Sequence, residues 1–285
     1  EALDSIRDVD FSLTSGGSPL YHQINIDVKR THPSIPLYAH ATTQKLLRKI
    51  LYLWAVRHPA SGYVQGINDL STPFFQTFLD HYLWLQTQTE SKFLIPQTWK
   101  CSAIGTPISG PVANLDPANI PTEVLVAIEA DTYWCLSRLL DNITDNYIPQ
   151  QPGIIRQVQA LQDLVSKIDP ELYNHLEAEG VQFLQFSFRW MNCLLMRELK
   201  MPLAVRMWDT YLLETPLGFH GFHVYVCAAF LIKFADELKR KDFQEIILFL
   251  QSPPTEYWGD KDVELMLLEA FIWQSLYKNA AAHLR

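Results

Sequence analysis

The sequence predicts an all-α protein, an irregular array of helices with no sheet. Apolar residues recur at helical spacing over most of the chain from Thr122 onward. Prolines separate these stretches, and only 11 of the 285 residues are glycine. No run alternates convincingly with the period of two that a half-buried strand would show. Together these observations favour helices throughout and make strands unnecessary.

Two parts of the chain are expected to lie outside the helical array. Residues 1–20 are a polar N-terminal segment ending in the small-residue linker 13–20, and residues 91–121, with five prolines and two glycines, are a long surface loop. The first helix is expected from Thr42 to the stop at His58–Pro59, followed by an apolar segment at 70–85. Further helices are expected at 123–141, 153–168, 170–178, 181–199, 203–213, 221–239, 242–250 and 261–277. They show no repeat, so we expect one domain over 21–285.

The composition is that of a globular protein, with 48% hydrophobic and 19% charged residues. The net charge of −8 disfavours binding to nucleic acid or to an anionic membrane surface through bulk positive charge. The most apolar stretch, Val224 to Ile232, is much shorter than the roughly 20 residues of a membrane span. No signal peptide opens the chain, because charges interrupt any apolar core there. A cytosolic protein with no transmembrane segment is therefore expected.

Metal and nucleotide sites of the common kinds are missing from the sequence. The four cysteines, Cys101, Cys135, Cys193 and Cys227, form no CxxC pair, and the last three are expected to be buried free thiols. His220 and His223 have no carboxylate or cysteine at ligand spacing, so no metal is expected. There is no GxxxxGK[ST], GxGxxG or GxSxG pattern. No cofactor bound by this chain itself is therefore expected.

The first of two candidate loop segments runs from Ile24 to Pro33. Its apolar residues alternate with polar ones and are expected to anchor the backbone, with Arg30 at the end. Asp27 lies three residues before Arg30 and would be its neighbour in a helical turn, so the carboxylate could orient the guanidinium. The alternative for such a spacing is an ordinary surface ion pair.

The second candidate segment runs from Tyr63 to Leu70 and contains Gln65. Gly62 and Gly66 bracket it, which permits tight backbone geometry and the close approach of a partner. The alternative interpretation is helix capping by Asn68 or Asp69. A glutamine cannot act as a general base, but its amide can orient a water molecule.

An arginine and a glutamine together suit phosphoryl transfer. That reaction needs a cationic group to neutralise the negative charge of the transition state and a correctly placed attacking water, with little covalent chemistry. Because the chain has no phosphate-binding loop, the nucleotide site would belong to a partner.

The two segments resemble the TBC-domain Rab GTPase-activating proteins. The resemblance rests on Ile24-x-x-Asp27-x-x-Arg30 followed by Tyr63-x-Gln65, and it covers about residue 21 to the C-terminus. Further matches are His58–Asp69, Ile143–Tyr147, Phe188–Glu198 and Trp208-Asp209, which look closest to the fungal Golgi-type branch and its animal counterparts.

The resemblance implies a V-shaped, all-helical domain that activates a GTP-bound Rab GTPase without turnover of its own. Arg30 is then the arginine finger and Gln65 the glutamine finger, inserted in trans, while GTP and Mg²⁺ are bound by the Rab. Ile24, Asp27, Tyr63, Gly66, Asn68 and Asp69 would support the fingers or contact the partner. A non-catalytic Rab-binding scaffold of the same fold is the alternative. A cytoplasmic protein at Golgi or other endomembranes is implied.

Two further expectations come from the resemblance. Residues of the third motif are expected to serve packing and buried hydrogen bonding, namely Arg189, Trp190, Asn192, Arg197 and Trp208. The family usually opens with helices carrying a Gly-x5-Arg-x3-Trp pattern, which residues 1–20 lack. A chain without those lead helices is expected to be less stable than one with them.

Overall fold

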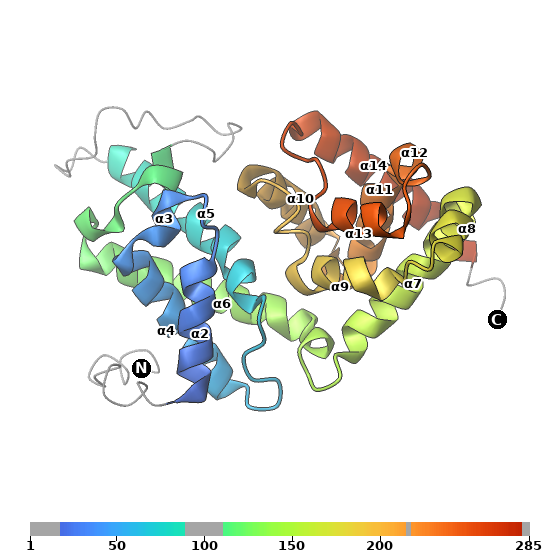
Figure 1. The fold of residues 1–285 in the computed structure, drawn as a ribbon. Coiled ribbons are helices and arrows are strands. Elements are labelled where there is room, and N and C mark those ends of the chain that lie inside the picture. The colour runs from blue at the N-terminus through green and yellow to red at the C-terminus, as the bar shows by residue number, and fades with distance from the viewer. Residues whose placement is uncertain (1–17, 89–110, 215–217, 281–285) are drawn as a thin grey trace. The chain divides into compact units, whose positions relative to one another are not determined.

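The structure is a computed structural model that describes residues 18–88, 111–214 and 218–280 (Figure 1). Every regular element in these ranges is a helix, so the all-α prediction is confirmed for the described part of the chain. By its internal contacts the chain divides into two compact units, Glu1–Asp141 and Asn142–Arg285.

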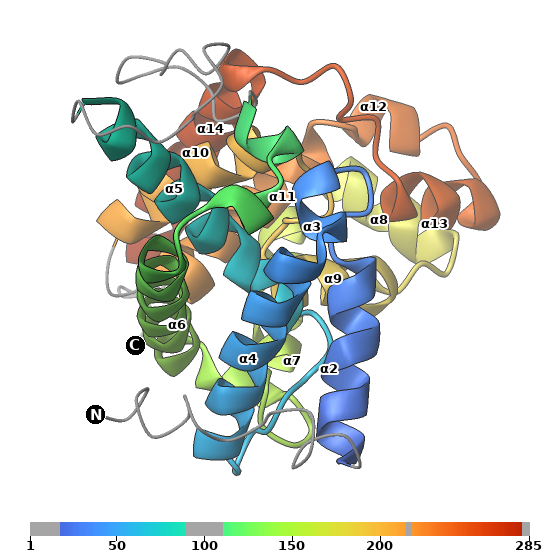
Figure 2. The ribbon, with the colours of Figure 1, turned by 90° about the vertical axis from the view of Figure 1, so that its left-hand side faces the viewer.

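The first unit is organised around a long helix, α4. Its α-helices are α2 (Pro19–Arg30), α3 (Pro36–Ala39), α4 (Ala41–Arg57), α5 (Ile67–Gln88) and α6 (Thr122–Asn142). Helices α2 and α4 lie side by side, drawn in blue in Figure 2. Apolar residues of α4 are buried at helical spacing, and Arg48 on the same helix donates a hydrogen bond of 2.9 Å to Asn25 of α2. On α4, Lys49 forms an ion pair with the buried Glu129 of α6. Helix α4 therefore holds α2 and α6 in place.

The interpretation of residues 24–30 as a loop segment is wrong, because they belong to α2. Ile24 and Val28 lie one turn apart on the buried face, whereas Ile26 is exposed. The apparent alternation arises because the buried face also contains a carboxylate, Asp27, which interrupts the apolar pattern of a helix. The helix begins at Pro19, inside the stretch interpreted as linker; residues 13–17 of that linker lie outside the described residues.

Most of the predicted surface loop 91–121 also lies outside the described residues. Its described end contains two short 3₁₀ helices, η2 (Pro111–Asn114) and η3 (Pro117–Asn119). Val112 of η2 is buried, and this turn contacts α3 and α5. The end of the predicted loop is therefore packed onto the first unit.

The second unit has an apolar helix at its centre. Its elements are η4 (Thr144–Asn146), α7 (Pro152–Ile168), α8 (Pro170–Ala178), α9 (Phe183–Cys193), α10 (Met201–Leu213), η5 (Gly218–Phe222, a π-helix), α11 (His223–Ile232), α12 (Ala235–Leu238), α13 (Phe243–Gln251) and α14 (Asp260–Ala280). Helix α11 contacts α7, α9 and α14 and is buried on nearly all sides, which explains its all-round apolar sequence. The Phe230 ring of α11 packs edge-on against Trp190 of α9.

Two predicted helices of this unit are wrong in extent. The helix expected at 181–199 ends at Cys193, because Leu194 and Leu195 adopt left-handed backbone angles with φ of 50° and 58°. No glycine marks this break, so the sequence gives no warning of it. The helix expected at 221–239 is divided into the end of η5, then α11 and α12.

Smaller expectations agree with the described residues. Cys193 and Cys227 are buried free thiols, as predicted, whereas Cys135 is only partly buried; Cys101 lies outside the described ranges. Among the described helices none is long and apolar enough to cross a membrane.

Candidate functional site

Arg30 is the last residue of α2 and points into solvent, with its side chain 60% exposed. The buried side chains of Ile24 and Val28 anchor the helix beneath it. The positive charges of Lys29 and Arg30 in the last turn interact favourably with the negative end of the helix dipole. The chain then leaves helical geometry at Thr31, and His32 adopts a positive φ of 41° before Pro33. The arginine is therefore presented at a sharp helix end, directly before the buried Thr31.

Gln65 lies in the turn that joins α4 to α5, and its side chain is exposed. Both glycines of this turn have left-handed backbone angles, with φ of 62° at Gly62 and 110° at Gly66. A side chain at Gly66 would be strained, so the prediction that the glycines permit tight geometry is confirmed. Because Gly66 and the first turn of α5 are buried, Gln65 is held outward on a fixed support.

Asp27 joins the two segments. Its side chain is 2% exposed, so the alternative of an ordinary surface ion pair with Arg30 does not hold. Arg30 Nη2 donates to Asp27 Oδ1 at 2.5 Å, while Gln23 Nε2 donates to Oδ2 at 3.1 Å. The Tyr63 hydroxyl, two residues before Gln65, lies 3.0 Å from the same Oδ2. A single buried carboxylate thus contacts both the arginine and the loop of the glutamine.

Asn68 forms a second connection between the segments. Its Oδ1 accepts the backbone N–H of Gly66 at 3.1 Å, which fixes the orientation of the amide. Its Nδ2 can then donate to Thr31 Oγ1 at 2.9 Å and to Asp69 Oδ1 at 3.1 Å. Asn68 thus caps the Gln65 turn through Gly66 and at the same time contacts the end of α2.

A third connection runs through His32. Its Nε2 lies 2.9 Å from Thr72 Oγ1, and that hydroxyl donates to the carbonyl of Asp69 at 2.7 Å. The hydroxyl hydrogen is thereby used, so His32 Nε2 is the donor in this pair. Three separate polar contacts therefore hold the end of α2 against the Gln65 turn and the start of α5.

The sequence did not identify all the residues of this network. Ile24, Asp27, Tyr63, Gly66, Asn68 and Asp69 all lie in or directly beneath it. Gln23 could have been found from its position four residues before Asp27 on a helix. Thr31 and His32 could not, because their partners are 37 and 40 residues away in the chain.

The residues of the third motif, from Arg189 to Trp208, lie in the second unit. The contacts described for them are packing and hydrogen bonds inside that unit. Trp190 and Asn192 are buried, and Trp208 Nε1 lies 3.4 Å from the Leu194 carbonyl. Arg189 Nε donates to Glu198 Oε1 at 2.6 Å; burial raises the pKa of Glu198, and the charge of Arg189 opposes that rise. Arg197 is exposed and does not share this burial.

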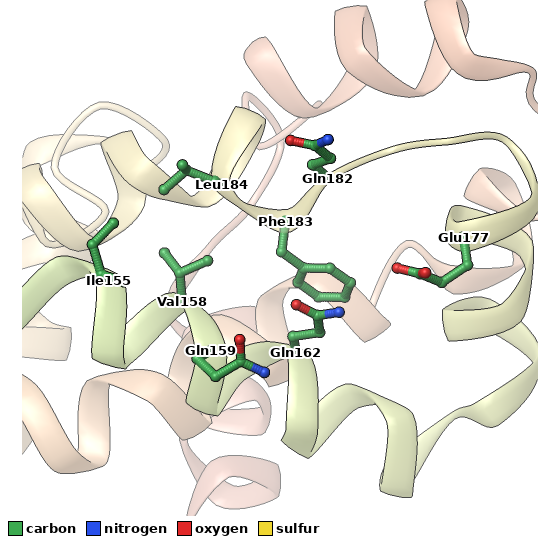
Figure 3. A pocket seen from close by; sticks show the side chains of 8 residues that line it. All are labelled: Ile155, Val158, Gln159, Gln162, Glu177, Gln182, Phe183 and Leu184. Carbon is green, nitrogen blue, oxygen red and sulfur yellow. The ribbon is translucent and has the colours of Figure 1, made fainter.

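The second unit has a hollow of about 290 Å³ (Figure 3). It is a weaker candidate for a catalytic or binding site than the Arg30–Gln65 surface. Its walls come from α7, the end of α8 and the start of α9, and include Ile155, Val158, Gln159, Gln162, Phe183 and Leu184. The glutamine amides are engaged within the protein: Gln159 donates to Asp163, and Gln162 lies 3.4 Å from the Tyr173 hydroxyl. Over the described residues, no group of three or more His, Cys, Asp or Glu side chains could hold a metal ion. The Arg30–Gln65 surface is therefore the candidate site.

Comparison with known proteins gives a consistent match. Residues 10–239 match the family described as Rab-GTPase-TBC domain. The chain is 51% identical to "GTPase-activating protein gyp1" of Schizosaccharomyces pombe over 289 residues, covering 100% of this chain and 52% of that protein. It is 46% identical to human "TBC1 domain family member 22B" over 266 residues, covering 93% of this chain and 48% of that protein. The chain spans about half the length of the curated relatives it matches.

A solved structure shares the fold as well. It is described as the crystal structure of the Ypt/Rab-GAP domain of Gyp1p, with a TM-score of 0.82 and 52% identity. The match covers 97% of this chain and 80% of that one.

Proposed function

The chain belongs to the Rab-GTPase-TBC domain family, as its motifs predicted, and on this premise we propose that it stimulates GTP hydrolysis by a Rab-family GTPase. In this proposal Arg30 and Gln65 act in trans on GTP and Mg²⁺ that the GTPase binds. The chain contributes catalytic groups but no cofactor of its own.

One observation carries the proposal: the two candidate side chains are far apart in sequence, exposed, and joined by a shared buried support. Arg30 and Tyr63 both contact the Asp27 carboxylate, and Gln65 follows Tyr63 by two residues. An arginine placed on an unsupported surface helix would lose more conformational entropy on entering a partner. Here that cost is reduced, because the network orders both segments beforehand.

The geometry suits an arginine that stabilises phosphate charge. A guanidinium has five N–H donors, and Asp27 receives its hydrogen bond from Nη2. The remaining donors can be directed to phosphate oxygens while Asp27 continues to orient the group. In a water-excluded site such a charge strongly stabilises the developing negative charge of phosphoryl transfer.

The exposed amide of Gln65 suits the second role. Its carbonyl oxygen can accept a hydrogen bond from the attacking water while its NH₂ group donates one to a phosphate oxygen. In this proposal Gln65 replaces the glutamine that a GTPase normally uses to orient water.

The test is phosphate release from a panel of purified, GTP-loaded Rab GTPases with and without this chain. We expect strong stimulation of at least one GTPase by the wild-type chain. Binding to a GTP-loaded Rab without stimulation would instead support the non-catalytic scaffold. Failure to bind or stimulate any member of a complete panel would contradict the proposed function.

We also propose that the protein acts in the cytoplasm, on Rab proteins of Golgi or other endomembranes, because its motifs resemble that branch of the family. Fluorescence microscopy of the tagged protein beside a Golgi marker tests this. A distribution independent of endomembranes would contradict it.

A further inference from the structure

We infer that Thr31 is a positioning residue that fixes the Gln65 turn relative to Arg30, so that the two fingers form one preassembled unit. This inference rests on the proposed function. Thr31 follows Arg30 directly and is 2% exposed, so it is placed to act inside the protein and not on the partner.

The hydrogen-bond directions around Thr31 are determined by its neighbours. Its hydroxyl donates to the Asp27 carbonyl at 2.9 Å, four residues back on α2. The oxygen is then available as an acceptor, and Asn68 Nδ2 donates to it at 2.9 Å. The Asp27 carbonyl can only accept a hydrogen bond and Asn68 Nδ2 can only donate one. Residue 31 must therefore both donate and accept, which a hydroxyl does.

Asn68 transmits this contact to the glutamine. Its Oδ1 accepts the N–H of Gly66, the residue next to Gln65. The path from α2 to the turn is therefore Thr31, Asn68, Gly66, with Gln65 at its end. This path meets the one through Asp27 and Tyr63, because the Tyr63 hydroxyl lies 3.2 Å from Asn68 Oδ1. The Asp27 carboxylate keeps its own hydrogen bonds from Arg30 and Gln23, so loss of the Thr31 hydroxyl should loosen the turn while leaving the Asp27–Arg30 contact in place.

Substituting Thr31 with valine separates shape from hydrogen bonding. Thr31→Val keeps the branched shape but removes the acceptor for Asn68, whereas Thr31→Ser keeps the hydroxyl and removes only a methyl group. Thr255 offers a matched control, because it is also buried and donates its hydroxyl to a backbone carbonyl, that of Glu198 in the second unit. Thr255→Val should therefore show the general cost in stability of losing one buried hydroxyl, without affecting the Gln65 turn.

The first measurement needs no GTPase. Hydrogen exchange followed by mass spectrometry, on peptides covering 62–68, should show faster exchange in Thr31→Val than in wild type, Thr31→Ser or Thr255→Val. The N–H of Gly66 is the amide whose protection depends on Asn68. Unchanged exchange in Thr31→Val would overturn the inference whether or not the chain activates a Rab.

The second measurement uses stimulated GTP hydrolysis. We expect Thr31→Val to lower kcat on the order of tenfold, with KM for the GTPase changed less than about twofold, since a displaced catalytic group mainly costs rate. Thr31→Ser should restore most of kcat.

A double variant separates this role from a general structural one. In a Gln65→Ala background, Thr31→Val should have little further effect, because the residue through which Thr31 acts is already lost. An equal loss of rate in both backgrounds would overturn the inference. If the wild-type chain stimulates no GTPase, the proposed function fails separately, and the hydrogen-exchange result still decides whether Thr31 orders the turn.

Discussion

Each of the two units buries a polar network, and the networks differ in where they lead. In the first unit, the hydrogen bonds of Asp27 and Asn68 lead to the exposed Arg30 and to the turn of Gln65. In the second, His223 is fully buried, with its Nδ1 2.8 Å from the Tyr211 hydroxyl and its Nε2 3.1 Å from the Trp190 carbonyl. Those partners are buried as well.

The difference indicates what each network is for. A buried polar group costs free energy unless it is hydrogen-bonded, so both networks must be satisfied to be tolerated. A network confined to the core can contribute only to the stability and uniqueness of the fold. A network that orders exposed side chains also prepares a surface for binding or catalysis. Substitutions in the first unit should therefore affect rate, and those in the second should affect stability.

The largest effect is expected at Arg30. Arg30→Ala should lower stimulated hydrolysis by about 10³–10⁵-fold, the usual value of an arginine finger. Arg30→Lys should recover little, because an ammonium lacks the planar fork of donors. Single-turnover hydrolysis measures the rate, and circular dichroism confirms the fold. Arg240→Ala, which removes an exposed arginine of the second unit, is the control. Near-normal activity of Arg30→Ala would contradict the finger assignment.

The next effect is expected at Gln65. Gln65→Ala should lower the stimulated rate by about 10²–10³-fold, as the loss of one preorganised catalytic hydrogen bond does elsewhere, with a smaller change in Rab affinity. If Gln65 replaces the Rab's own glutamine, a Rab with that glutamine changed to Leu should still be stimulated. An inert Leu-bearing Rab together with a fully active Gln65→Ala chain would exclude the two-finger mechanism.

These two residues also show how far the sequence could predict the site. Residue type and motif spacing are enough to predict Arg30 and Gln65 as candidates, because the chemistry that they suit is local to each side chain, and their finger roles come from the resemblance and stay a prediction. The helix around Arg30 was missed, because a buried carboxylate occupies a position where the pattern of a helix calls for an apolar residue. The contact of Thr31 with Asn68 depends on tertiary structure and has no signature in spacing.

The same limit applies to the fold. Long helices with one apolar face, such as α7, were predicted nearly to the residue. The break after Cys193 was missed, because two leucines adopt left-handed angles there under the constraint of packing. Sequence patterns report local preference, and such positions are determined by contacts between distant residues.

A smaller effect on rate is expected at Tyr63, whose hydroxyl joins the Gln65 turn to the carboxylate that holds Arg30. Tyr63→Phe keeps the ring and removes the hydroxyl, which contacts both Asp27 and Asn68, so the stimulated rate should fall about tenfold. Stability should fall by about 1 kcal/mol, the usual net value of one hydrogen bond. Urea unfolding and single-turnover kinetics measure the two effects. A loss of stability with no loss of rate would mean that this contact serves only the fold.

The smallest effect on rate, and a clear effect on stability, is expected at His223. Burial lowers the pKa of His223 to about 4 from its ordinary 6.5, with the hydrogen bond to the Trp190 carbonyl opposing the shift and His220 adding to it. The imidazole is therefore neutral in the folded protein at pH values where the unfolded chain binds a proton. Stability is complete above about pH 6.5 and falls as the pH drops toward 4, by on the order of 3 kcal/mol in total.

A variant isolates this contribution from that of other groups. His223→Gln can keep both hydrogen bonds, since the amide accepts from Tyr211 and donates to Trp190, but it does not titrate. Glu198 acts in the opposite direction, because its pKa is raised and its burial favours the folded state at low pH, yet it is present in both proteins. The difference between wild type and variant therefore reports His223 alone. Urea unfolding between about pH 7 and pH 4 should show a shallower loss in His223→Gln, with the stimulated rate at pH 7 changed little. Equal pH slopes would mean that the buried network of the second unit does not depend on a neutral histidine.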